Sequence, residues 1–285
     1  MAFPRPWSPI LIVLLLVSIL GTACAGSAPA AIPELAIQAA DFSFTAPDSI
    51  PGGLTRISMT NIGKEDHHAQ LARLNDGVTV TQFQDTLKKG EAAVFPLVTF
   101  EGGAGGMPAG GKSSGLADLP SGQYLVLCFF PSPDGTPHLV KGMIKSLPVT
   151  AKPAKAPTPP KAQTVDLGDF SFTGVAASYG PGSFTLEGVN KGKQVHELIA
   201  VKVADGVTAE QLRQILSAPP SAGGPPPGPP PFAFAGGMQA VMAGAKAYGE
   251  FNLQPGQYAF LCFVPDPSNG TPRVALGMYT PFTVK

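Results

Sequence analysis

A cysteine, a histidine and a methionine lie within one short stretch of this chain, CFFPSPDGTPHLVKGM at residues 128–143. The three residues are Cys128, His138 and Met143, and strand-like residues flank the stretch on either side. Thiolate, imidazole and thioether groups are all metal ligands. The stretch therefore suggests a metal site, whose formation depends on the elements that hold these side chains.

The sequence contains an internal repeat. DFSFT occurs at residues 41–45 and again at 169–173, and NIGKEDHHAQLARLNDGVT at 61–79 aligns without a gap to NKGKQVHELIAVKVADGVT at 190–208. Later in each copy, LPSGQYLVLCFFPSPDGTPHLVKGM aligns with LQPGQYAFLCFVPDPSNGTPRVALGM, with one inserted residue. The alignment pairs three residues of each copy: His67 with His196, Cys128 with Cys262, and Met143 with Met278. Two copies predict two domains of one fold.

The composition narrows the classes of function. Lys+Arg and Asp+Glu number 19 each, so we expect neither nucleic acid nor an anionic membrane surface as an electrostatic partner. The chain has 34 Gly and 32 Pro, which favours an all-β chain rich in turns. It has four histidines and no His-x-His pair, no Gly-x-Ser-x-Gly elbow, no phosphate loop and no His-Glu-x-x-His helix, so we do not expect an enzyme.

An export signal is predicted at the N-terminus. Arg5 precedes an apolar run at 10–20 that is too short to span a bilayer, and Gly21, Thr22 and Ala23 follow it. Cys24 after these small residues resembles the lipidated cysteine of a bacterial lipoprotein, although Gly21 stands where leucine is usual. Cleavage after Ala25 is the alternative. Either way we expect an extracytoplasmic protein, secreted or held at the cell membrane through a lipid on Cys24.

The division of the chain follows from these features: a signal at 1–24, a tether at 25–34, a first domain at 35–150, a linker at 151–164 and a second domain at 165–285. The linker AKPAKAPTPPKAQT favours extended polyproline II, which predicts a spacer of roughly 40 Å between separable domains.

Alternation and β-branched or aromatic residues predict strands in the first domain at 37–44, 54–60, 67–74, 94–99, 122–130 and 143–150, with counterparts in the second. One short helix is predicted in each domain, because Thr79 with Gln82, and Thr208 with Gln211, match capping boxes. LPSGQY and LQPGQY resemble the tyrosine corner of Greek-key sandwiches.

The glycine-rich and proline-rich segments at 101–115 and 219–238 contain too many strand breakers for strands, so we expect solvated loops. The alternative is that Phe232, Phe234 and Met238 close over one end of the domain or form an apolar contact surface.

Each copy resembles a cupredoxin, the Greek-key β-sandwich of plastocyanin and azurin. In that family an early histidine follows an Asn-containing loop, and a Gly-x-Tyr strand ends in cysteine before a loop with histidine and methionine. Here Asn61 precedes His67, and Tyr124 precedes Cys128. The resemblance covers both repeats and predicts an all-β chain of two tandem Greek-key β-sandwiches.

The resemblance implies a type 1 copper site in the first domain, with the ligands His67, Cys128, His138 and Met143. Two imidazoles, one thiolate and a weak axial thioether suit both Cu(I) and Cu(II), so one electron enters or leaves with little rearrangement. Nine residues separate Cys128 from His138, where the family usually has two to four. Pro131, Pro133 and Asp134-Gly135 favour turns that would fold this loop back as a hairpin.

The second domain lacks one ligand, because Arg273 stands where His138 stands in the first. A guanidinium is permanently cationic and does not bind copper, so we expect copper in the first domain only. Each residue also has a structural alternative: the cysteines and methionines as core residues, His67 and His196 as hydrogen-bond donors, and His68 as an exposed side chain pointing away from His67. A Cys128–Cys262 disulfide is not expected, because equivalent inward positions of two tethered sandwiches do not approach closely enough.

Two functions remain open from the sequence. The first is an exported, lipid-anchored tandem cupredoxin with one copper for electron transfer or copper handling, together with a redox or envelope protein partner. The second is a metal-free binding or structural module of the cell envelope that uses the same fold as a scaffold.

Overall fold

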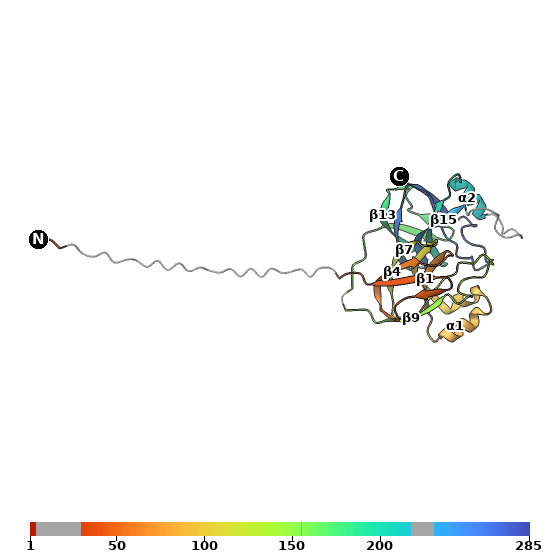
Figure 1. Ribbon diagram of the computed structural model, residues 1–285, viewed down its shortest axis with the longest axis horizontal. Helices are drawn as coiled ribbons and strands as arrows, with labels where there is room; N and C mark the ends of the chain where they lie inside the picture. The colour runs from red at the N-terminus through yellow and green to blue at the C-terminus, as the bar shows by residue number, and fades with distance from the viewer. Residues whose placement is uncertain (4–29, 155, 218–230) are drawn as a thin grey trace.

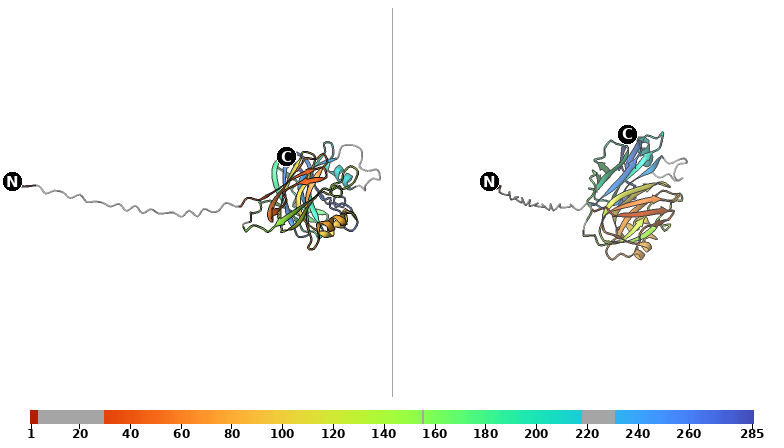
Figure 2. Two further views of the ribbon diagram at one scale, coloured as in Figure 1. Left: turned by 60° about the horizontal axis from the view of Figure 1, so that its bottom comes forward. Right: turned by 60° about the vertical axis from the view of Figure 1, so that its left-hand side comes forward.

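The computed structural model describes residues 1–3, 30–154, 156–217 and 231–285. Two β-sheets pack face to face and run through both repeats (Figures 1 and 2). Residues 4–24 of the predicted signal, Cys24 among them, lie outside the described residues, as do residues 219–230 of the second glycine-rich and proline-rich segment. Within the described part of the chain, no helix has both the length and the apolar character needed to span a bilayer.

The first sheet contains eight strands, in the order β11 (Ser171–Thr173), β10 (Gln163–Gly168), β13 (Gly182–Asn190), β16 (Lys246–Leu253), β7 (Lys112–Leu119), β4 (Gly53–Asn61), β1 (Glu34–Ala40) and β2 (Ser43–Thr45). The second contains ten, in the order β12 (Ser178–Tyr179), β18 (Tyr279–Val284), β17 (Gly256–Leu261), β14 (His196–Val203), β15 (Phe232–Val241), β6 (Val98–Met107), β5 (His67–Leu74), β8 (Gly122–Leu127), β9 (Ile144–Thr150) and β3 (Ile50–Pro51).

Each repeat contributes one half of both sheets. The first repeat crosses between the sheets from β4 to β5, from β6 to β7 and from β7 to β8, and the second does so at the corresponding strands. The side chains between the sheets form one apolar core that includes residues of both repeats. The predicted all-β architecture of two sandwiches is therefore confirmed.

The two repeats are joined edge to edge, which corrects the prediction of separable units. β7 pairs antiparallel with β16 in one sheet, and β6 pairs antiparallel with β15 in the other. The side chain of Gln70 on β5 donates to the Ala240 carbonyl at 3.0 Å and accepts from the Ala240 N–H at 2.9 Å. Arg56 forms a two-point ion pair with Glu250 across the other sheet. The linker at 151–164 therefore connects halves of one body, although its composition predicted a spacer.

Glycine allows this close junction, and the prediction of loops at 101–115 is wrong. Most of that segment forms β6 and β7, and residues 232–238 lie in β15. A Cβ on Gly105 would lie 2.3 Å from the amide nitrogen of Gly237 in the other repeat. Within the first repeat, a Cβ on Gly103 would lie 2.0 Å from the Ala69 carbonyl oxygen. Glycine disfavours isolated strands, but here its missing side chain lets strands of two repeats approach.

The local signals in the sequence are confirmed. Helix α1 (Val80–Leu87) has a complete capping box between Thr79 and Gln82, and helix α2 (Ala209–Ser217) has the same pair of hydrogen bonds between Thr208 and Gln211. The hydroxyl groups of the corner tyrosines donate at 2.9 Å to backbone carbonyls four residues earlier, Tyr124 to Pro120 and Tyr258 to Gln254.

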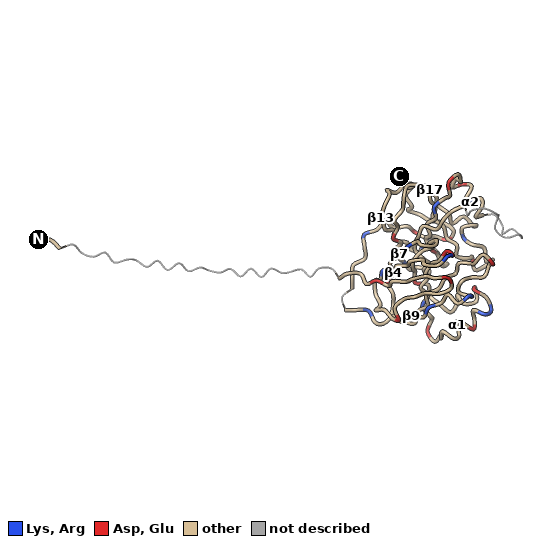
Figure 3. Tube along the Cα trace, in the orientation of Figure 1, with Lys and Arg blue, Asp and Glu red and all other residues tan. Residues whose placement is uncertain are grey.

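Strand boundaries differ in one important place. The predicted strand at 94–99 is mostly a 3-10 helix, η1 (Glu91–Leu97), and β6 begins at Val98. Pro96 explains the difference, because proline has no N–H for a sheet ladder. Basic and acidic residues are interspersed along the described chain (Figure 3), as the balanced composition implies.

We expect Gly105→Ala to destabilise the protein by on the order of 2 kcal/mol, because the added methyl group would force β6 away from β15. The free energy of unfolding in urea measures this effect. Gly180→Ala is the matched control, since no atom lies within 4 Å of a Cβ at Gly180. Equal stability of the two variants would contradict the close junction.

Candidate metal centre

Two of the predicted ligands come from neighbouring strands of the ten-stranded sheet. His67 is the first residue of β5, and Cys128 directly follows β8, which pairs antiparallel with β5. Because side chains alternate along a strand, His67 shares the inward face with Ala69 and Leu71. Both His67 and Cys128 are fully buried at this end of the core.

The loop after Cys128 folds back as a hairpin, as its turn residues predicted. Pro131 and Pro137 form an isolated antiparallel bridge, and the N–H of Gly135 donates to the Ser132 carbonyl at 2.8 Å. The N–H of Leu139 donates to the Cys128 carbonyl at 2.9 Å. The nine residues between Cys128 and His138 form this hairpin, which brings His138, the residue before Leu139, close to Cys128.

Three potential ligand atoms converge at this position. Nδ1 of His67 lies 3.1 Å from Nδ1 of His138, and Sγ of Cys128 lies 3.9 Å from the first nitrogen and 3.4 Å from the second. His138 is fully buried like the other two residues. These three residues are the cluster of potential metal ligands found within the described part of the chain.

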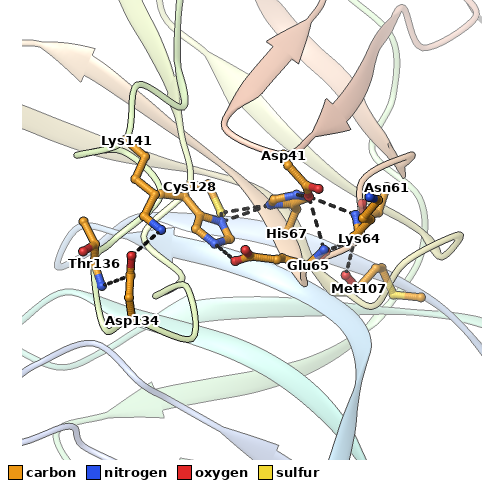
Figure 4. A network of polar contacts seen from close by, with 11 residues as sticks. Asp41, Asn61, Lys64, Glu65, His67, Met107, Cys128, Asp134, Thr136 and Lys141 are labelled. Atoms are coloured by element: carbon orange, nitrogen blue, oxygen red, sulfur yellow. Dashed lines mark hydrogen bonds and ion pairs between the residues drawn. The ribbon is translucent and has the colours of Figure 1, made fainter.

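A carboxylate contacts the outer nitrogen of each imidazole (Figure 4). Nε2 of His67 lies 3.1 Å from Oδ1 of Asp41, and Nε2 of His138 lies 2.8 Å from Oε2 of Glu65. An ionised carboxylate only accepts hydrogen bonds, so each Nε2 must donate. In the neutral rings both Nδ1 atoms then carry lone pairs, which face each other and the sulfur. Both Nδ1 atoms are then available to accept a hydrogen bond or to bind a metal ion.

Asp41 is fixed by a turn that the sequence showed only as part of the DFSFT repeat. Its Oδ1 also accepts from the backbone N–H groups of Lys64 at 2.9 Å and Glu65 at 3.2 Å. Burial would raise the pKa of Asp41, but these donors and His67 outweigh burial and lower it. Phe42 follows in the left-handed region with φ 63°, a strained conformation for this residue, and its ring packs edge-on against His138 at 5.4 Å.

Gly63 leaves room for the contact between Asp41 and His67. A Cβ at Gly63 would lie 2.4 Å from Oδ1 of Asp41 and 2.7 Å from Nε2 of His67. Asn61 anchors the same loop, accepting from the Gly63 N–H at 2.9 Å and donating to the Glu65 carbonyl at 2.8 Å. The recurrence of Asn-x-Gly-Lys in both repeats was the available signal for this support, and sequence analysis did not assign it.

Without a bound cation, burial favours the neutral forms of Cys128 and His67. Burial raises the pKa of the Cys128 thiol to about 12, so the thiolate is strongly disfavoured without a compensating cation. Burial also lowers the pKa of His67, with the hydrogen bond to Asp41 acting in the opposite direction. A metal ion would supply the positive charge that stabilises a thiolate here.

The distances fit a metal ion. Typical lengths of about 2.0–2.1 Å to imidazole nitrogen and about 2.3 Å to thiolate sulfur, with the ion in the plane of three donors, place the nitrogens about 3.5 Å apart and each about 3.8 Å from the sulfur. The observed separations of 3.1, 3.9 and 3.4 Å depart from these values by about 0.4 Å or less. Two imidazoles and one thiolate are also the donor set of a blue copper site.

Met143 is fully buried and shares the apolar core with Cys128. Its N–H donates to the His138 carbonyl at 2.9 Å, which ties the end of the loop to the ligand histidine. Met278 of the second repeat is equally buried and makes the same bond to Arg273. Burial is therefore a property of the fold at this position, and an axial role for Met143 stays a prediction.

His68 does point away from His67, but the prediction that it is exposed is wrong. Its side chain is 3% exposed, and Nε2 accepts from the Phe129 N–H at 2.8 Å. The ring also packs against Phe130, with ring centroids 4.6 Å apart. Exposure was predicted because the outer face of an isolated sandwich is solvated, whereas here the second repeat and the hairpin cover it.

The second repeat has the same aspartate contact to its histidine, but it lacks the full set of potential ligands. Sγ of Cys262 lies 4.0 Å from Nδ1 of His196, whose Nε2 contacts Oδ1 of Asp169 at 2.8 Å. Arg273 is 1% exposed and donates to the Val264 carbonyl at 2.9 Å. It also donates to the side chain of Gln194, the residue aligned with Glu65.

The replacement of His138 and Glu65 by Arg273 and Gln194 changes both members of one contact. The guanidinium brings a permanent positive charge to the region where the first repeat has the imidazole of His138. This asymmetry agrees with a metal site in the first repeat alone. Cys128 and Cys262 are both free, as expected.

Comparisons with solved structures returned copper proteins. An auracyanin from Roseiflexus castenholzii is 21% identical with a TM-score of 0.29, and the match covers 43% of this chain and 94% of that one. Auracyanin A from Chloroflexus aurantiacus, a blue copper protein, is 14% identical with a TM-score of 0.30, covering 42% and 100%. A copper nitrite reductase from Nitrosomonas europaea is 14% identical with a TM-score of 0.26, covering 90% and 94%.

No family model and no curated protein sequence matches the chain. Identities and TM-scores as low as those of the structural matches carry no argument about function. The function therefore has to be argued from the side chains of the site.

We expect the metal-free protein to lose stability as pH rises above about 9. The pKa values of Cys128 and Cys262 are raised from 9.0 to about 12 in the folded protein, because burial disfavours both thiolates. The unfolded chain then releases thiol protons first, so each thiol lowers the free energy of unfolding by up to about 1.4 kcal/mol per pH unit between pH 9 and 12. Urea unfolding between pH 7 and 10.5 measures the slope.

Tyrosines also titrate in this pH range. The test therefore compares the slope of stability against pH between the parent protein and a variant without the two thiols. The Cys128→Ala, Cys262→Ala double variant should show a shallower alkaline slope than the parent protein, whatever its stability at pH 7. An identical slope would contradict the burial of the thiols.

Proposed function

We propose that this chain is an exported blue copper protein that holds one copper ion in its first repeat and serves in electron transfer or copper handling. The observation that carries the proposal is the convergence of Nδ1 of His67, Nδ1 of His138 and Sγ of Cys128, with both Nε2 atoms held by carboxylates. A bound copper ion would supply a one-electron redox couple at this position.

The protein's own residues would prepare the site in three ways. Asp41 and Glu65 fix the ring orientations and tautomers of the two imidazoles. The hairpin carries His138 on a backbone bonded to Cys128 and Met143, so the ligands change position little between oxidation states. Complete burial of Cys128 excludes water from the thiol.

The contacts that the four histidines make favour electron transfer over catalysis. The chain has four: two converge with Cys128, His68 accepts a backbone hydrogen bond, and His196 faces Cys262 in the repeat that carries Arg273. A second, catalytic copper would need further imidazoles. A metal-free scaffold is less favoured, because it would leave the facing Nδ1 lone pairs of the first repeat without a function.

Export and anchoring belong to the same proposal. The apolar run before Cys24 supports a signal of the lipoprotein type, and an extracytoplasmic copper carrier would act beside the membrane with a redox protein as partner. Fractionation of cells that produce the parent protein and Cys24→Ser tests the anchor. Membrane association of the parent and release of the variant support it, and equal distribution of the two would refute it.

Adding Cu(II) to the purified protein should give one equivalent of bound copper and an intense visible thiolate-to-copper charge-transfer band. Cys128→Ser should abolish the band, because the thiolate is its donor. The internal repeat offers a matched control: Cys262→Ser changes the equivalent buried thiol, and the band should be unaffected. Loss of the band in both variants, or its absence in the parent protein, would contradict the proposal.

The reciprocal experiment restores the missing ligand and its carboxylate in the second repeat. The double variant Arg273→His, Gln194→Glu should bind two equivalents of copper, because His196 and Cys262 already occupy the equivalent positions. Circular dichroism establishes that the variant is folded. A folded double variant that still binds one equivalent would show that the three donors are insufficient.

A further inference from the structure

A cavity of about 500 Å³ lies at the junction of the two repeats. It covers the face of the ten-stranded sheet opposite the sandwich core, since its lining residues His68 and Glu197 each alternate with the core-facing His67 and His196. The strands beneath it are β14, β15, β6 and β5, so both repeats build it. Its volume lies within the range of about 300–1,000 Å³ typical of small-molecule sites.

Equivalent residues of the two repeats line the cavity with different chemistry. The alignment pairs His68 with Glu197, and each side chain accepts from the residue after the aligned cysteine: His68 from Phe129 at 2.8 Å and Glu197 from Phe263 at 2.7 Å. One position in this pair is therefore an imidazole and the other a carboxyl group. A purely structural junction would not require this difference.

The remaining walls are mainly apolar, and six of their side chains are phenylalanine rings. Rings from both repeats contribute, namely Phe95, Phe100, Phe129, Phe130, Phe234 and Phe263. Phe130 of the first repeat stacks on Phe234 of the second, with centroids 4.5 Å apart. The faces and edges of these rings give the cavity an apolar surface that also attracts cations through the ring quadrupole.

The charged lining is acidic. Among the described residues, the carboxyl groups at the cavity are Asp66, Glu91 and Glu197, and no lysine or arginine lines it. Burial raises the pKa of Glu197 to about 7 and that of Glu91 to about 6. Arg273, which does not line the cavity, acts on Glu197 in the opposite direction but does not outweigh burial.

His68 adds an unused hydrogen-bond donor. Its Nε2 accepts from Phe129, so the neutral ring carries its proton on Nδ1, which is buried and has no partner. A buried donor without a partner is costly. A ligand oxygen in the cavity would satisfy it.

We propose that this cavity binds a small organic cation: an ammonium group on an aromatic body, with an oxygen acceptor available for His68. Glu197 pairs with the ammonium group, and the phenylalanine rings surround the body and the charge. This site is formed by the protein alone, so it does not depend on the copper proposal.

The test is calorimetric titration of the full, metal-free two-repeat protein with three probes of one shape. They are (6-methoxy-2-naphthyl)methylamine as the cation, (6-methoxy-2-naphthyl)methanol as its neutral counterpart and (6-methoxy-2-naphthyl)acetate as an anion, so that all three carry the same ether oxygen for His68. We expect the amine to bind at least about tenfold more tightly than the alcohol, and the acetate to bind most weakly. Equal binding of all three, or no binding of the amine at millimolar concentration, would overturn the proposal.

Glu197→Gln keeps the shape and the bond from Phe263 while removing the charge, so it should reduce amine affinity about tenfold and leave the alcohol unchanged. Phe263→Leu should weaken the amine more than the alcohol, because it removes a ring face. Glu210→Gln, an exposed change on α2, is the control and should have no effect. A folded Glu197→Gln protein with undiminished amine affinity would refute the role of this carboxylate.

Discussion

Two hydrogen bonds determine the chemistry of the first repeat. Asp41 and Glu65 each accept from the outer nitrogen of a buried histidine, and they thereby turn both inner nitrogens toward the thiol of Cys128. Without a cation, two lone pairs and a protonated thiol share one desolvated position. The strained turn at Phe42 and the missing side chain of Gly63 have a common physical role, since both allow this support to form.

The two repeats share one fold, so a comparison of their equivalent residues shows what individual positions contribute to the site. The second repeat has the same turn, the same aspartate contact and the same buried cysteine, yet Arg273 and Gln194 replace His138 and Glu65. The fold therefore accommodates a permanently charged guanidinium at the position of His138. The two repeats also differ on the opposite face of the sheet, where His68 and Glu197 occupy equivalent positions beside the shared cavity.

Local signals allowed much of the fold to be predicted, because capping boxes, tyrosine corners and strand alternation act over a few residues. The convergence of His67, Cys128 and His138 followed from the family resemblance and from turn chemistry. The junction did not follow, because glycine is a strand breaker in isolation, and only the neighbouring repeat explains why Gly105 lies in a strand. The burial of His68 was missed for the same reason, since no single-repeat pattern indicates what covers a sheet.

The most direct measurement of the central claim is copper X-ray absorption on the protein loaded with one equivalent of copper. The account predicts two nitrogen ligands at about 2.0 Å and one sulfur ligand at about 2.3 Å, with the sulfur ligand lost in Cys128→Ser and retained in Cys262→Ser. A shell of nitrogen and oxygen alone would contradict it, because copper would then be bound away from the thiol.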